Sequence, residues 1–256
     1  MTPNSQLSSL DEWFDKVFVI SLPTSTARRQ SVEQEFKQMG IGRYELVNAI
    51  DGFTLDLDSL RANGTLLNEK LTAGEVGAYL SHIKVFQDSL ERGYERVLVC
   101  EDDIVFSQNA KELFHNYLTR MPEDWDIIHF HSHIPFGSNG STARNRQPLL
   151  PGIYRGYNEG GGTLCNAYSK RCLTYLLNRA FPFKGAIDGL TNWPTGWWTK
   201  GYKGYIVSPF PCRPGGFMNE TERRGRMPSA EKQRFMVSLA NHGIRRQKDL
   251  HTKFSL

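Results

Sequence analysis

The sequence has no long hydrophobic run, few cysteines and none of the common phosphate-binding or nucleophile motifs among its 256 residues. No window approaches the ~18 consecutive apolar residues of a membrane-spanning helix, and residues 1–10 lack the basic start and apolar stretch of a secretory signal. Four cysteines in a chain of this length do not form a disulfide scaffold. There is no Gly-x-x-x-x-Gly-Lys loop, Gly-x-Ser-x-Gly elbow or Cys-x-x-Cys pair. We therefore predict a cytoplasmic protein with buried, reduced thiols.

Charge is distributed unevenly along the chain. Residues 213–256 carry ten Lys and Arg against four Asp and Glu, a balance of +6, whereas the rest of the chain has a balance of −2. A basic tail, with a helix predicted from Pro228, suits an anionic partner such as phosphate groups or acidic lipid, although a solvated basic helix explains it equally well. The body offers no nucleic-acid recognition motif, so no nucleic acid is expected as a partner.

Hydrophobic periodicity predicts an α/β domain. The apolar run 17–20 reads as a buried strand, residues 25–40 as an amphipathic helix and residues 44–47 as a second strand, which together form a βαβ unit. Thr72 and Glu75 have the spacing of a capping box at the start of another helix. Further strands are expected at 96–100, 104–106, 126–130, 163–167 and 205–207, helices at 107–118 and 169–177, and a long loop at 132–161.

The acidic triplet Glu101-Asp102-Asp103 follows the strand at 96–100 directly. Ligands of open α/β sheets bind outside the carboxyl ends of the strands, which is where this triplet falls. Alternation along a continuing strand would place Glu101 and Asp103 on the same side, where two carboxylates suit Mn²⁺ or Mg²⁺ bridging a diphosphate. An acidic turn that faces water is the alternative, and the sequence leaves both open.

Three other positions are candidates for chemistry. Glu75 and His82 share a helix face that could point into a cleft, although Glu75 also serves the capping box and His82 could be an ordinary buried histidine. Asp188, in a segment rich in Gly and Trp, could act as a general base or could simply cap a short helix.

Two aromatic groups also stand out. His129, His131 and His133 alternate, so a continuing strand would place them on one face and could hold zinc, although Pro135 indicates that the strand is ending there. Trp193, Trp197 and Trp198 could form a platform for sugar rings or could belong to the core.

Four segments in this order resemble the signatures of glycosyltransferase family 25, the lipooligosaccharide and procollagen galactosyltransferases. They are residues 17–29 (VFVISLPTSTARR), 48–52 (NAIDG), 71–83 (LTAGEVGAYLSHI) and 97–106 (VLVCEDDIVF). The resemblance covers roughly residues 15–210. It implies a GT-A-type, Rossmann-like fold with a mostly parallel central sheet flanked by helices, a nucleotide-sugar donor that is usually UDP-galactose, and a divalent metal.

The resemblance also implies roles for individual residues. Asp103 would ligate the metal, and Glu101 or Asp102 would contact the ribose or the ion. Asp188 would lie near the acceptor. The donor cleft would be lined by Leu22, Pro23, Arg29, Asp51, Glu75 and His82. The histidines at 129–133, the loop at 132–161 and the tryptophans at 193–198 depart from the family pattern.

Together these features predict a metal-dependent, inverting galactosyltransferase that acts on a glycan such as lipooligosaccharide. Its GT-A-like domain would occupy residues 1–212, with a nucleotide-sugar half at 15–125 and an acceptor half at 126–212, and residues 213–256 would form a basic helical extension that contacts the inner membrane peripherally. A transferase for another UDP-sugar and a non-catalytic sugar-binding module are the alternatives.

Overall fold

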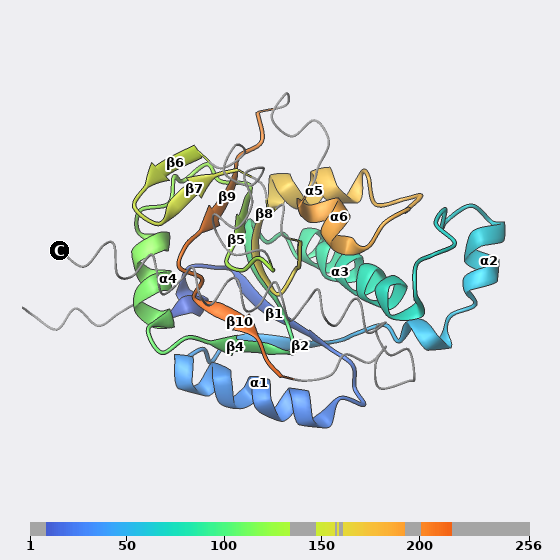
Figure 1. The fold of residues 1–256 in the computed structure, drawn as a ribbon, viewed down its shortest axis with the longest axis horizontal. Coiled ribbons are helices and arrows are strands. Elements are labelled where there is room, and N and C mark those ends of the chain that lie inside the picture. Colours follow the sequence, from blue (N-terminus) through green and yellow to red (C-terminus); the bar gives the residue numbers. More distant parts are fainter. Residues whose placement is uncertain (1–8, 134–146, 157, 159–160, 193–200, 217–256) are drawn as a thin grey trace, which may run out of the picture.

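The computed structural model describes residues 9–133, 147–156, 158, 161–192 and 201–216, which fold around an eight-stranded sheet (Figure 1). The strands are β1 (Lys16–Ser21), β2 (Tyr44–Asn48), β3 (Arg96–Glu101), β4 (Ile104–Phe106), β5 (Ile127–His129), β6 (Gln147–Leu150), β7 (Ile153–Arg155), β8 (Cys165–Ser169), β9 (Gly204–Val207) and β10 (Cys212–Pro214). The helices are α1 (Thr26–Met39), α2 (Leu57–Ala62), α3 (Ala73–Glu91), α4 (Ala110–Leu118), α5 (Lys170–Leu177) and α6 (Ile187–Asn192). Short 3₁₀ turns lie at Leu10–Glu12 and Gly52–Thr54.

The large sheet has the order β2-β1-β3-β8-β5-β9-β7-β6, and β4 pairs separately with β10. Strands β2, β1 and β3 are mutually parallel, β8 runs antiparallel between β3 and β5, and β5 is parallel to β9. The hairpin β6–β7 completes the edge beside β9. Six of the eight strands consequently point the same way, with β7 and β8 reversed, so the predicted α/β class with a mostly parallel sheet is confirmed.

The first βαβ unit forms as its periodicity predicts. Strand β1 is buried at every position after Lys16, and α1 packs Val32 and Phe36 onto the sheet. Helix α1 ends at Gly40, whose φ of 71° is a left-handed cap that favours glycine. The parallel pairing of β1 with β2 and with β3 then brings the carboxyl ends of three strands to one edge.

Two hydrophobic layers enclose the sheet. On one face α1 and α4 pack over alternate residues of β1 and β3, such as Val19 and Leu98. On the other face α3 and α5 cover the intervening residues, such as Phe18 and Val99. Strand β3 is thus covered on both faces, as its apolar sequence predicts, and all four cysteines are buried free thiols.

Two details differ from the sequence-based expectations, and two further expectations are not tested. The segment 132–161, expected to be a loop, contains the hairpin β6–β7. Its Pro148 is compatible with a strand because β6 lies at the edge of the sheet, where a missing N–H is tolerated. Asn109, and not Ser107, precedes α4. The basic tail beyond residue 216 and the tryptophans at 193–198 lie outside the described residues. Within the described ranges, no helix combines the length and hydropathy needed to cross a bilayer.

Candidate functional site

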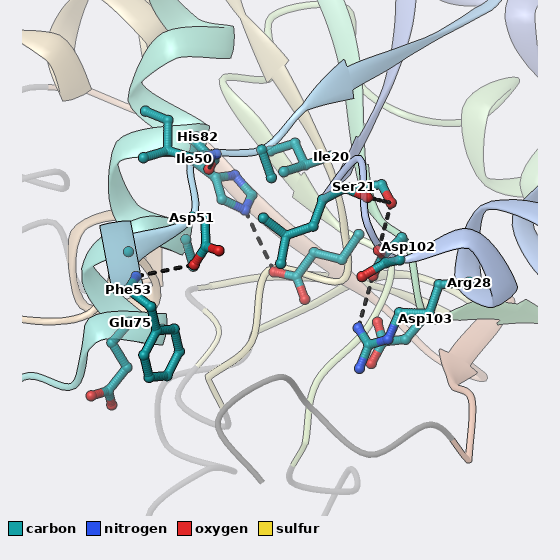
Figure 2. A pocket seen from close by; sticks show the side chains of 18 residues that line it. Ile20, Ser21, Arg28, Ile50, Asp51, Phe53, Glu75, His82, Asp102 and Asp103 are labelled. Carbon is teal, nitrogen blue, oxygen red and sulfur yellow. Dashed lines mark hydrogen bonds and ion pairs between the residues drawn. The ribbon is translucent and has the colours of Figure 1, made fainter. Parts of the chain in front are cut away.

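An open cleft of about 310 Å³ lies where β1 and β3 end (Figure 2). Its walls come from the end of β1 and the start of α1, from residues 49–53 after β2, from the first half of α3, and from the acidic turn 101–103. Because β1, β2 and β3 are parallel, their carboxyl ends deliver these segments to the same edge of the sheet. The cleft therefore gathers segments that are more than 80 residues apart in the sequence.

The acidic triplet does not continue as a strand. Strand β3 ends at Glu101, Asp102 and Asp103 form a turn, and β4 begins at Ile104. All three carboxylates nevertheless line the cleft, each in a different environment. The strand alternation that predicted Glu101 and Asp103 on one side is therefore replaced by a turn that brings both into the cleft.

Glu101 is fixed by two neighbours. Its Oε1 lies 3.5 Å from His82 Nε2 and also accepts a hydrogen bond from Thr163 Oγ1. Burial raises the pKa of Glu101, but the hydrogen bond and charge of His82, together with Thr163, outweigh it and lower the pKa overall. The carboxylate thus stays ionised while 35% of the side chain remains exposed to the cleft.

Asp103 has the opposite electrostatic environment. Burial and the neighbouring charge of Glu101 raise its pKa to about 6, although Arg28 opposes this shift. Its Oδ1 atom is buried and makes no hydrogen bond. An unpaired carboxylate oxygen beside a second carboxylate is the arrangement that a hard divalent cation would satisfy, so these two residues fit a Mn²⁺ or Mg²⁺ site.

Asp102 is bonded within the protein. Arg28 Nη1 donates to its Oδ1 at 2.8 Å and Ser21 Oγ donates to its Oδ2 at 2.7 Å. Only 7% of Asp102 is exposed. No local pattern in the sequence predicts this partnership, and the sequence analysis does not identify Arg28 and Ser21 as residues of the cleft wall.

Helix α3 holds the loop after β2 against the cleft. Ser81 Oγ accepts a hydrogen bond from Ile50 N at 2.8 Å and donates to Gly77 O at 2.6 Å. A Cβ atom on Gly52 would lie 1.7 Å from the carbonyl oxygen of Ala73, so only glycine permits this approach of loop and helix. Packing of the loop against the helix therefore accounts for Gly52, Gly77 and Ser81 in the two signature segments.

The residues predicted at 51–82 all reach the cleft, although with different partners. Asp51 caps the following turn by accepting from Phe53 N at 3.0 Å, and Phe53, 37% exposed, joins it in the cleft wall. Glu75 completes the predicted capping box with Thr72, and Figure 2 shows its carboxylate directed away from the acidic turn. His82 is 1% exposed and faces Glu101.

The predicted residues after β1 divide between two locations. Leu22 lines the cleft, whereas Pro23 is exposed and, like Arg29, is not part of its wall. The Arg29 guanidinium binds the Ser21 and Leu22 carbonyls at 2.8 and 3.1 Å and also Asn48 Oδ1. Arg29 therefore joins the ends of β1 and β2, and Arg28 is the arginine that faces the cleft.

Asp188 lies in the first turn of α6, outside the walls of this cleft. Its Oδ2 is 3.5 Å from Gly162 N, and a Cβ on Gly161 would lie 2.9 Å from the same oxygen. The residue after this glycine turn, Thr163, is the one that donates to Glu101. Asp188 therefore lies beside the Gly161–Gly162 turn, and the next residue along the chain, Thr163, contacts Glu101 in the cleft.

The three histidines do not form a zinc site. Strand β5 ends at His129, which pairs with Asn166 Oδ1 at 3.1 Å, so the strand alternation does not extend to His133. His131 is buried, and burial followed by the charge of His133 lowers its pKa to about 4. Within the described ranges, no three His, Cys, Asp or Glu side chains are grouped so as to hold a metal by themselves.

A protein-family model described as glycosyltransferase family 25 (LPS biosynthesis protein) matches residues 14–142. This match covers half of the chain and includes every cleft segment described above. The chain belongs to glycosyltransferase family 25. The acidic turn, the capping box and the Ser21–Arg28 segment are therefore family 25 segments, whereas Asp188 lies beyond the matched residues.

Known members of family 25 differ in activity. The chain is 38% identical over 133 residues to inactive glycosyltransferase 25 family member 3 of Homo sapiens, covering 45% of this chain and 21% of that protein. It is 28% identical over 146 residues to procollagen galactosyltransferase 2 of Homo sapiens, covering 50% of this chain and 23% of that protein. The chain thus matches about a fifth of the length of these relatives. One of them is named as inactive and the other as a galactosyltransferase.

Proposed function

We propose that this chain is a metal-dependent, inverting glycosyltransferase that moves galactose from UDP-galactose onto a glycan acceptor such as lipooligosaccharide. The observation that carries this proposal is the charge of the cleft. Its walls hold five carboxylates (Asp51, Glu75, Glu101, Asp102 and Asp103), and Arg28 is the one Lys or Arg among its described lining residues. A diphosphate would be repelled by such walls unless a cation intervened.

The residues that would hold the cation are Asp103 and Glu101. Two carboxylates suffice for this role because Mg²⁺ and Mn²⁺ sites in phosphate-handling enzymes take further oxygens from the substrate's phosphates. When bound, the ion would neutralise the charge that develops on the departing diphosphate. His82 and Thr163 hold Glu101 ionised and oriented for this purpose.

The remaining cleft walls suit a nucleoside. Phe53 presents a half-exposed ring at the cleft wall, where a uracil base could stack on it, a contact worth about 1–3 kcal/mol. Asp51, on the same turn, is positioned by its hydrogen bond from Phe53 N to accept from a ribose hydroxyl. These two residues lie across the cleft from the acidic turn, as Figure 2 shows, so the base and the diphosphate would occupy separate walls.

Asp188 is the general base of the proposal. It would remove the proton from the acceptor hydroxyl, which then attacks the anomeric carbon on the face opposite the departing diphosphate and inverts its configuration. Its contact with Gly162, one residue before the Thr163 that donates to Glu101, supports this role.

The test is release of UDP from UDP-galactose in the presence of a lipooligosaccharide extract. We expect turnover with Mn²⁺, loss of turnover with EDTA, and recovery when Mn²⁺ is added back. Asp188→Asn should lower kcat by about 10²- to 10⁴-fold, with donor binding retained. Asp58→Asn is the matched control, because Asp58 is 95% exposed on α2, away from the cleft. Failure of the purified protein to bind UDP with or without Mn²⁺ would end the proposal.

Two alternatives are outcomes of the same assay. Turnover with UDP-glucose or a UDP-N-acetylhexosamine in preference to UDP-galactose would change the donor but keep the mechanism. Binding of UDP-sugar or glycan without any turnover would indicate a non-catalytic module, which the similarity to a relative named as inactive makes a specific second candidate.

The basic residues at 213–256 lead to a proposal about location. We infer peripheral contact with an anionic inner membrane surface, because each Lys or Arg near acidic lipid contributes about 1 kcal/mol. The full chain should sediment with vesicles containing acidic lipid and be released by salt. A chain truncated after residue 212 should remain in solution, and equal sedimentation of both chains would contradict the proposal.

A further inference from the structure

Both oxygens of the middle carboxylate of the acidic turn are already bonded to side chains of the protein. Asp102 is 7% exposed, its Oδ1 accepts from Arg28 at 2.8 Å, and its Oδ2 accepts from Ser21 at 2.7 Å. A metal ion or a ribose hydroxyl would have to share an oxygen that already accepts one of these bonds. By contrast, the neighbouring Asp103 has an unpartnered buried oxygen, and Glu101 is 35% exposed.

The bonds of Asp102 connect the turn after β3 to two adjacent elements that lie 81 and 74 positions earlier in the sequence. Ser21 is the last residue of β1, Arg28 lies in the first turn of α1, and Asp102 lies in the turn between β3 and β4. The ion pair joins side chains that are 11% and 10% exposed, so little water screens it. Removing either partner of the ion pair would leave the other buried without its opposite charge. The pair therefore fixes the position of the turn relative to helix α1.

Arg28 is oriented by this pairing toward the cleft. The adjacent Arg29 turns the other way and binds the Ser21 and Leu22 carbonyls. Among the described residues of the cleft walls, Arg28 is the one Lys or Arg, and Asp103 lies in the same walls. Guanidinium groups bind phosphate oxygens through charge-assisted hydrogen bonds, so the arginine held here matches the charged part of a nucleotide-sugar.

We propose that Asp102 is a positioning residue that binds no ligand but holds the Arg28 guanidinium at the cleft wall, where Arg28 contacts the donor diphosphate. This inference rests on the proposed use of the cleft by a nucleotide-sugar. It assigns the three adjacent carboxylates to different tasks. Asp103 and Glu101 would hold the cation, whereas Asp102 orders the arginine beside Asp103.

The experiment is a double-mutant cycle on UDP affinity, measured by calorimetry with the full chain in saturating Mn²⁺. Arg28→Met should weaken UDP binding by about tenfold or more, the effect of one charge-assisted contact. Asp102→Asn alone should weaken it severalfold, because Arg28 is then no longer held. In the Arg28→Met background, Asp102→Asn should change UDP affinity by less than about twofold, because both act through the same guanidinium.

A second readout separates positioning from ligation. Mn²⁺ binding without nucleotide, followed by the EPR signal of the free ion, should stay within about twofold of wild type in Asp102→Asn and weaken clearly in Asp103→Asn. Ser21→Ala removes one anchor of Asp102 without burying an unpaired charge. Ser21→Ala should weaken UDP binding slightly in the wild-type background and leave it unchanged in the Arg28→Met background. If Asp102→Asn does not fold, Ser21→Ala replaces it in the double-mutant cycle.

Each result decides the question. Multiplicative effects of Arg28→Met and Asp102→Asn, or a loss of Mn²⁺ affinity in Asp102→Asn, would show that Asp102 contacts the ligand itself and would overturn the inference. An unchanged UDP affinity in Arg28→Met would overturn it as well. A wild-type protein that binds no UDP at all would overturn the proposed function, and this inference with it, in the first measurement of the series.

Discussion

Asp103 and Asp126 lie at opposite ends of the same sheet and differ in what surrounds them. Asp103 follows the carboxyl end of β3, whereas Asp126 precedes the amino end of β5, which runs in the same direction. Asp126 is 1% exposed and accepts from Arg171 Nε at 2.7 Å, from Arg171 Nη2 and from Lys203 N at 2.6 Å. Asp103 has an unpartnered oxygen and like charge beside it.

The charged residues around the two carboxylates also differ in how fully they are paired. Around Asp126 the neighbouring charges are paired, as Glu95 is with Lys170 and Asp124 is with Lys203. The cleft around Asp103 has several carboxylates and one arginine, and that arginine is already bonded to Asp102. A buried carboxylate whose bonds are all satisfied stabilises the fold, whereas one left unsatisfied among like charges is suited to a ligand.

The largest expected difference between the two residues is in turnover. Asp103→Asn should lower UDP release from UDP-galactose by about 10³-fold or more, because the neutral amide is a poor ligand for a cation that stabilises the leaving diphosphate. Asp126→Asn should stay within about threefold of wild type per folded molecule, because Asp126 lies at the other end of the sheet. Equal losses in both variants would show that the cleft carboxylate has no special role in the chemistry.

The sequence predicts much of this contrast but not all of it. The apolar strand at 96–100 and the capping box of Thr72 and Glu75 are local patterns, and they correctly place the acidic turn and α3 at the cleft. Neither pattern distinguishes Arg28 from Arg29, because both follow the same helix start and their partners are set by folding. Asp102 and Arg28 are 74 positions apart, a distance over which no periodicity carries information.

The hairpin β6–β7 is the part of the sheet that the sequence does not predict, for a physical reason. Strand β7 is three residues long, and β6 is exposed along its length at the sheet edge. Short or fully exposed strands leave no alternating hydrophobic signal in the sequence. The composition around Asp188 and the family resemblance predict a candidate base, but its link to Glu101 through Thr163 depends on β8 pairing with β3.

A smaller difference is expected in stability. Asp126→Asn should lower the free energy of unfolding by about 2–4 kcal/mol, because it removes charged hydrogen bonds from a buried group that joins β5, α5 and β9. Asp124→Asn is the control, since Asp124 is 58% exposed and its loss should cost less than about 0.5 kcal/mol. Denaturant unfolding of the three chains at neutral pH measures this. A loss in Asp126→Asn no larger than that of the control would contradict the structural role.

An effect of similar size is expected in the pH dependence that Asp103 adds to stability in the absence of metal. Its pKa is about 6 in the folded chain against 3.8 for an ordinary aspartate, so the folded state binds the proton more tightly than the unfolded state. Its contribution is therefore fully favourable below about pH 4, is lost as the pH rises toward 6, and is constant above that. In EDTA, the free energy of unfolding of wild type minus that of Asp103→Asn should accordingly fall between these pH values. Groups such as Asp11, whose pKa is lowered, cancel in this difference. A difference that does not change with pH would mean that Asp103 titrates normally, and the cleft would then not impose the repulsion that makes a cation necessary.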